Sequence, residues 1–111
     1  PASVAQVVRG QAASAGVRQG RARLIHTLAD AGKLQPGEVL ITKAATPPWT
    51  PLFGVATAVV TDTGGILSHC AVIAREYGIP AVVGTGQATH IFRTGQLLEV
   101  NGTTGTVRII N

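Results

Sequence analysis

Apolar residues along this chain come in short runs that are separated by glycine, proline and small polar residues. Two runs, residues 58–61 and 81–83, are almost entirely apolar, a pattern typical of strands that are covered on both faces. Runs that are rich in β-branched residues or that partly alternate predict five more strands, over residues 4–10, 17–26, 38–43, 97–100 and 106–110. The last two flank the glycine-bearing segment 101–105, which predicts a hairpin.

Helices are predicted to be few and short. Residues 27–34, 51–56 and 85–93 are each expected to form a short helix or helical turn, and the main helix is expected between the strands 58–61 and 81–83. Residues 11–16 are small and turn-prone. The adjacent Pro47 and Pro48 predict an extended path, without a helix, over residues 44–51. This order of elements indicates a compact, layered α/β fold with short strands.

The composition agrees with one small domain over residues 1–111. Hydrophobic residues make up 45% of the chain and charged residues only 13%, which suits a packed core rather than disorder. Fourteen glycines and six prolines predict many tight turns. The single cysteine, Cys70, excludes an intrachain disulfide and a cysteine-built zinc site, and is predicted to be a small buried side chain.

The formal charge of +4 comes from nine Lys and Arg residues that are scattered along the chain. No run of five basic residues exists, so nucleic-acid binding is not predicted. No apolar run approaches the roughly 20 residues of a membrane helix, and no signal peptide is visible. No membrane partner is therefore predicted, and the cytoplasm is the expected location.

His69 is the main candidate for chemistry, because it lies where a glycine turn becomes the main helix. Gly64 and Gly65 permit a sharp turn after the strand, and Ser68 is placed to cap the helix. His69 then falls in the first turn, where free backbone N–H groups and the helix dipole favour an anion and disfavour imidazolium. The sequence predicts a neutral, nucleophilic ring that accepts a phosphoryl group. The alternative is a histidine that only bonds a carbonyl at the helix start.

Other candidate residues have plainer interpretations. Arg75 lies six residues after His69, about 9 Å along a helix and roughly 120° around it, which favours an ion pair or a partner contact over a phosphate clamp. The segment Gly84-Thr85-Gly86 lacks the third glycine and the acidic residue of a dinucleotide fingerprint, so a plain turn is favoured. The rest are interpreted as structural: His26 and His90 as surface residues without ligand-spaced companions, and Trp49 as a packing anchor.

Residues Gly64-Gly65-Ile66-Leu67-Ser68-His69, and those that follow as far as Gly84, resemble the mobile phosphohistidine domain of phosphoenolpyruvate-utilising enzymes. That family includes phosphoenolpyruvate synthase, pyruvate phosphate dikinase, enzyme I of the sugar phosphotransferase system and rifampicin phosphotransferase. The segment Thr46-Pro47-Pro48-Trp49-Thr50-Pro51-Leu52-Phe53 also resembles the family's threonine-proline segment. Enzyme I and the dikinase usually have threonine where this chain has Leu67, so the resemblance favours the synthase or drug-phosphotransferase branch.

The resemblance implies a swivelling β/β/α domain whose histidine takes a phosphoryl group at one active site and delivers it at another. By that likeness His69 is phosphorylated at Nε2, and Gly64, Gly65 and Ser68 stabilise the phosphoryl group. Residues 1–111 would be a fragment of, or a partner to, a larger multidomain phosphotransferase of the dikinase type.

The missing parts of such an enzyme can also be named. The chain has no Walker P-loop and no carboxylate cluster for Mg²⁺, so no cofactor or metal is predicted in it. ATP and Mg²⁺ are expected in an ATP-binding domain, and the acceptor in another domain, of the same or a partner chain. The sequence leaves open whether ATP or phosphoenolpyruvate is the donor, and whether pyruvate or a small-molecule hydroxyl is the acceptor. A non-catalytic docking or ligand-binding module with the same fold is the alternative.

Overall fold

The computed structural model describes residues 7–110. Within this range the chain forms eight strands, two α-helices and two 3₁₀ helices. The strands are β1 (Val7–Arg9), β2 (Gln11–Ser14), β3 (Val17–Leu24), β4 (Val39–Thr42), β5 (Ala58–Thr61), β6 (Ala81–Val83), β7 (Leu97–Asn101) and β8 (Thr106–Ile109). The helices are η1 (Leu28–Lys33), η2 (Pro47–Gly54), α1 (His69–Tyr77) and α2 (Ala88–Ile91).

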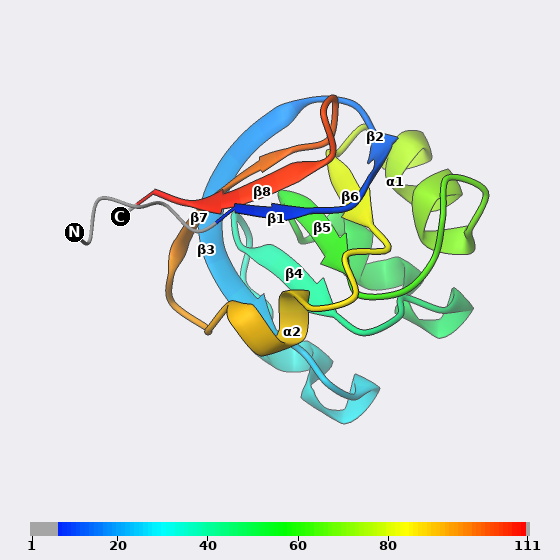
Figure 1. The fold of residues 1–111 in the computed structure, drawn as a ribbon. Helices are drawn as coiled ribbons and strands as arrows, with labels where there is room; N and C mark the ends of the chain where they lie inside the picture. The colour runs from blue at the N-terminus through cyan, green and yellow to red at the C-terminus, as the bar shows by residue number, and fades with distance from the viewer. Residues whose placement is uncertain (1–6, 111) are drawn as a thin grey trace.

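The strands form one sheet in the order β1-β8-β7-β3-β4-β5-β6-β2, which curls round on itself. Strands β3 to β6 run parallel to one another, and all other pairs are antiparallel. Strands β1 and β2 lie at opposite edges of the sheet, yet only Gly10 separates them in the chain (Figure 1). A Cβ atom on Gly10 would lie 2.5 Å from the carbonyl oxygen of Val83, so only glycine fits at this crossing.

Two hydrophobic clusters divide the molecule into three layers. In β5, Ala58 and Val60 pack in a cluster with residues of β7 and β8, whereas Val59 packs in a second cluster with residues of η2 and α1. Strands β4 and β6 alternate in the same way. Figure 1 shows α1 beyond β6, on the side away from β7 and β8. The architecture is therefore β/β/α, as expected, and the parallel strands form the middle layer.

Most of the predicted elements are confirmed. Strands β5 and β6 have the predicted bounds, and the hairpin of β7 and β8 is present. The first predicted strand is found as Val7–Arg9, and its residues 4–6 lie outside the described residues. The predicted helices over 27–34 and 85–93 are shorter, as η1 and α2.

Two expectations were wrong. Residues 11–16, expected as a turn, contain β2, because β6 supplies hydrogen-bond partners from a distant part of the chain. Residues 44–51 were expected to be extended, yet η2 begins at Pro47. Pro47 and Pro48 occupy the first helical positions, where backbone N–H groups have no intrahelical acceptor, so the prolines lose no hydrogen bond there.

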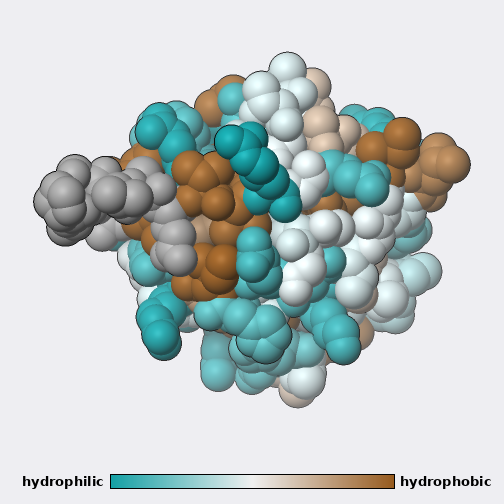
Figure 2. Space-filling view, in the orientation of Figure 1, coloured by the Kyte–Doolittle hydropathy of each residue, from teal (hydrophilic) through white to brown (hydrophobic). Residues whose placement is uncertain are grey.

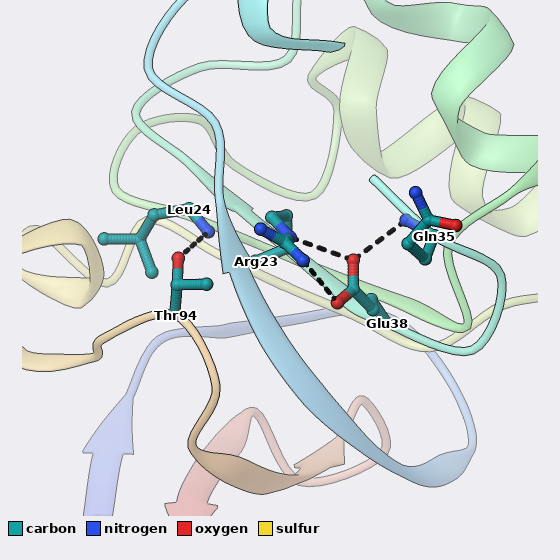
Figure 3. A network of polar contacts seen from close by, with 5 residues as sticks. All are labelled: Arg23, Leu24, Gln35, Glu38 and Thr94. Carbon is teal, nitrogen blue, oxygen red and sulfur yellow. Dashed lines mark hydrogen bonds and ion pairs between the residues drawn. The ribbon is translucent and has the colours of Figure 1, made fainter. Parts of the chain in front are cut away.

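A polar network joins the middle layer to the connection before β4 (Figure 3). Arg23 Nε and Nη2 donate to the two carboxylate oxygens of Glu38, both at 3.0 Å, and the backbone N–H of Gln35 donates to Oε1. Desolvation raises the pKa of the Glu38 carboxyl, but the hydrogen bonds from Arg23 and Gln35 outweigh it and leave that pKa below its ordinary value. On the face that Figure 2 shows, hydrophilic residues are spread rather than gathered in one area.

Candidate functional site

The loop between β5 and α1 places His69 at the start of the helix. Gly64 has φ +100°, and a Cβ atom there would lie 3.2 Å from Ser68 Oγ. The N–H of Ser68 then donates to the carbonyl of Gly65, which closes the turn. Gly64 is therefore the glycine on which this turn depends. Gly65 has no positive φ, so the expectation that both glycines need special backbone angles holds for Gly64 alone.

Ser68 is the N-cap of α1, as predicted. Its hydroxyl accepts the N–H of Ala71 at 3.3 Å, and His69 is the first residue of the helix. The backbone N–H groups of His69 and Cys70 belong to the same first turn, where an α-helix offers no acceptor of its own. The predicted combination of a cap, a histidine and uncommitted N–H donors is present.

Thr50, a residue of η2, contacts the imidazole of His69. Its Oγ1 lies 3.1 Å from His69 Nε2 and also donates to the carbonyl oxygen of Pro47 at 2.8 Å. A hydroxyl has one proton to donate, so in this arrangement the ring N–H at Nε2 donates to Thr50. In the neutral form of the ring, this arrangement leaves the lone pair on Nδ1.

The half-buried ring of His69 lines a hollow of about 180 Å³. Since one water takes about 30 Å³ in the liquid, a tetrahedral anion fits in this volume. The other lining residues are small or hydroxyl-bearing and carry no charge: Ala44, Ala45, Thr46, Pro47, Thr63, Gly64, Ser68 and Cys70. An anion at this site would therefore be bound by hydroxyls and backbone dipoles rather than by a full positive charge.

Arg75 is not directed at this hollow. Its Nε donates to the carbonyl of Ala13 at 2.7 Å and its Nη2 donates to the carbonyl of Ile66 at 2.6 Å. The guanidinium thus ties α1 to β2 and to the loop that carries His69. Of the two expected roles, the ion pair is wrong, because both acceptors are main-chain oxygens, and the contact with a partner domain stays a prediction.

The other sequence candidates are largely structural, as expected. Cys70 is buried, and desolvation raises the pKa of its thiol to about 12, so it is not a thiolate at neutral pH. Trp49 is 6% exposed and packs in the cluster with α1. Gly84 and Gly86 both have positive φ in the turn after β6.

His26 and His90 are exposed, as expected, but they are not isolated. The two residues lie 64 positions apart in the sequence and line one hollow together with Lys43 and Asp62. No local pattern in the sequence indicates this proximity, because it results from the parallel strands.

Two residues of the site were missed by sequence reasoning. Thr50 was noticed only as part of the threonine-proline segment, and no spacing rule predicts its contact with His69. Gln11 accepts the N–H of Ile66 with its side-chain oxygen at 3.2 Å and so supports the loop from β2. Both contacts depend on tertiary structure that local pattern does not show.

Two negative findings apply to residues 7–110. No group of three or more His, Cys, Asp or Glu side chains in this range is placed to hold a metal ion. None of the helices described there has the length and apolar character that crossing a membrane requires.

The fold and this site together define a β/β/α domain that presents one histidine at the start of a capped helix. The chain belongs to the family of the PEP-utilising enzyme mobile domain, whose model matches residues 34–105. The predicted resemblance is thereby confirmed.

Individual relatives agree with this assignment. The chain is 48% identical over 102 residues to a phosphoenolpyruvate synthase of Aeropyrum pernix, with 91% of this chain covered. It is 45% identical over 106 residues to a rifampicin phosphotransferase of Bacillus cereus, with 96% covered. A solution structure of Enzyme I superposes with a TM-score of 0.63 at 35% identity, covering 72% of this chain and 33% of that one.

The chain spans only 12% of the length of each of these two enzyme relatives. It therefore corresponds to one small part of larger phosphotransferases.

Proposed function

We propose that this chain is a phosphoryl carrier. In this function His69 accepts a phosphoryl group from an ATP- or phosphoenolpyruvate-using domain and delivers it to an acceptor. The observation that supports this most is the half-buried imidazole of His69, which faces an uncharged hollow of about 180 Å³ beside the first turn of α1. Relatives that are named as a phosphoenolpyruvate synthase and a rifampicin phosphotransferase provide the second support.

The local environment suits both halves of a transfer. In loading, a ring nitrogen of His69 donates its lone pair to phosphorus, and the bond from phosphorus to the leaving oxygen breaks with its electron pair on that oxygen. The first-turn N–H groups and the hydroxyl of Ser68 lie beside His69 and would donate to the oxygens of the transferred phosphoryl group. Because no charged side chain lines the hollow, the phosphoryl group would be held weakly enough to be passed on.

Phosphorylation at Nε2, as the resemblance implies, requires one local change. Nε2 is the nitrogen that contacts Thr50 at 3.1 Å, and this contact occupies the direction in which a bond to phosphorus would form. The imidazole must therefore leave Thr50, and the ring proton must move from Nε2 to Nδ1, before Nε2 can attack. Thr50 is a positioning residue in this scheme.

The donor and the acceptor would be supplied by other domains. The names of the relatives suggest two acceptors, pyruvate for a synthase and a small-molecule hydroxyl for a drug phosphotransferase. The domains that bind ATP with Mg²⁺ and the acceptor would lie in the same or a partner chain.

The proposal is tested by placing the chain in the position of its counterpart in the Bacillus cereus rifampicin phosphotransferase. The chimera is incubated with ATP that carries ³²P on its β- or γ-phosphate, and acid-labile, base-stable label is counted. The chimera that carries the unsubstituted chain should be labelled, and His69→Ala should abolish the label. His90→Ala is the matched control and should be labelled like the unsubstituted chimera. Equal labelling of the His69→Ala chimera would refute the carrier function.

The same chimera distinguishes the alternative of a docking module. Such a module would support normal turnover after His69→Gln, since only its shape would matter. Loss of turnover in His69→Gln, with a normal unfolding temperature, supports the carrier.

A further inference from the structure

A second hollow, of about 420 Å³, lies at the carboxyl ends of the parallel strands. His26 follows β3, Lys43 follows β4, and Asp62 and Thr63 follow β5. Gly86, Thr89 and His90 complete the lining from the segment after β6. In open α/β sheets, the carboxyl edge of parallel strands is where ligands commonly bind.

Three basic side chains of this hollow have free hydrogen-bonding capacity. The side chains of His26, Lys43 and His90 make no hydrogen bond or ion pair to any residue in the described part of the chain. The ammonium of Lys43 alone carries three donors, and each imidazole carries at least one. The hollow therefore offers more donors than acceptors.

Asp62, the acidic residue of the lining, is already engaged. Its Oδ1 accepts the N–H of Thr89 at 3.1 Å and the hydroxyl of Thr85 at 3.4 Å, and its Oδ2 accepts the hydroxyl of Thr89. The carboxylate thus fixes the start of α2 to the loop after β5. Since its lone pairs are partly satisfied, it competes less for the free donors.

We propose that this hollow is a second anion site, for ligands of the phosphate class. Lys43, His26 and His90 would donate to the phosphate oxygens. Thr63 lines both this hollow and the hollow of His69, so the two sites adjoin along one residue. The site goes beyond the carrier function and does not depend on His69 being phosphorylated.

The chain allows a sharp test, because it contains three histidines and two lysines. In the His69→Ala variant the only remaining imidazoles are those of His26 and His90. Their Cε1–H proton resonances are followed while inorganic phosphate, pyrophosphate or AMP is added at constant pH and ionic strength. Both resonances should shift along saturating titration curves that give the same dissociation constant.

The lysines provide a matched pair of variants. Lys43→Gln should weaken phosphate binding about tenfold, as expected for a lost charged hydrogen bond. Lys33→Gln, which removes an exposed lysine paired with Asp30 outside the hollow, should leave binding unchanged. Tighter binding of AMP than of phosphate would indicate a nucleotide as the source of the anion, and equal or weaker binding would indicate a free phosphate.

Three results would overturn this site. The first is a resonance shift that rises linearly with phosphate concentration and does not saturate. The second is a shift that is unchanged in Lys43→Gln. The third is acetate binding as tight as phosphate binding, which would indicate the carboxylates of a protein partner instead. The dispersion of amide resonances confirms that each variant is folded. If His69→Ala is not folded, His69→Gln replaces it. Because the readout is binding to a chain without His69, failure here leaves the carrier function untouched.

Discussion

At the residue scale, the hydroxyl of Thr50 determines which nitrogen of His69 is available. The hydroxyl donates a hydrogen bond to the carbonyl oxygen of Pro47 and accepts one from Nε2 of His69. The ring is therefore restrained through the nitrogen whose phosphorylation the family resemblance implies. A net hydrogen bond contributes about 0.5–1.5 kcal/mol, which is enough to hold the ring without locking it. The resting ring is thus oriented but releasable.

Thr50→Val should load at least as fast as the parent chain, because it has no contact to release. Its free energy of unfolding should fall by about 1 kcal/mol, since the bond to Pro47 is also lost. Thr50→Ser keeps the hydroxyl and should match the parent in both respects. Stopped-flow labelling of the chimera measures the loading rate. A tenfold slower Thr50→Val would show that the hydroxyl assists the transfer itself.

Substitutions of Ser68 separate its structural role from its predicted role at the phosphoryl group. Ser68→Ala removes the cap and should lower the free energy of unfolding by about 1 kcal/mol. Ser68→Asp keeps a capping oxygen and should retain that stability, but its negative charge should oppose loading of His69. Urea unfolding and phosphoryl labelling measure the two effects. Unimpaired labelling of Ser68→Asp would contradict the placement of the phosphoryl group beside this hydroxyl.

At the scale of elements, local pattern was enough wherever a segment carries its own signal. Strands β5 and β6 were predicted correctly from their apolar runs, and the start of α1 from Ser68 and His69. Burial on both faces and helix capping are local requirements, so a short segment shows them. Strand β2 and the start of helix η2 were mispredicted, although the helix predicted over residues 51–56 overlaps the end of η2. The first depends on a distant strand, β6, and the second on three prolines fitting a 3₁₀ helix.

The same limit applies to the site. His69, Ser68 and the turn at Gly64 are neighbours in sequence and could be found together. Thr50 and the hollow that holds His26 and His90 join distant segments, so only the folded sheet brings them together.

The ion pair between β3 and the turn before β4 should make stability depend on pH. The pKa of the Glu38 carboxyl is depressed in the folded chain. The ion pair's contribution to the free energy of unfolding is therefore present above the ordinary carboxyl pKa of about 4.3, and it is lost as the pH falls through the pKa of the folded chain. Glu38→Gln should be about 1–2 kcal/mol less stable than the parent at pH 7. This difference should shrink as the pH is lowered from 5 to 3 in urea titrations. A difference that is constant over that range would contradict the role of the pair.

At the scale of the whole molecule, the sheet curls round on itself, because β1 and β2 are consecutive in the chain and lie at its two edges. Gly10 makes this crossing possible, and the N–H of Gly10 donates to the carbonyl of Gly105 at 2.9 Å. Because strands β3 to β6 run parallel, their carboxyl ends lie at one edge of the sheet, where both hollows lie. The position of the site is thus a consequence of the topology.

Gly10→Ala should therefore destabilise the whole domain. The added Cβ would lie 2.5 Å from a main-chain oxygen, and overpacking of this kind costs about 1–3 kcal/mol. Gly32→Ala is the matched control, because an added Cβ there meets nothing within 4 Å and φ is not positive. The control should be neutral or more stable by up to about 1 kcal/mol. Equal stability of Gly10→Ala and the parent in urea unfolding would show that the crossing can accommodate a methyl group at residue 10.

The most direct test of the carrier function is to locate the phosphoryl group on the loaded chain. The chimera, with ¹⁵N-labelled histidine, is loaded from its donor, and the ³¹P spectrum is recorded with and without ¹⁵N decoupling. One phosphorus resonance coupled to an imidazole nitrogen, and absent in His69→Ala, is the predicted result. A phosphoryl group on Ser68, Thr50 or another residue, or none while the donor domain consumes ATP, would contradict it.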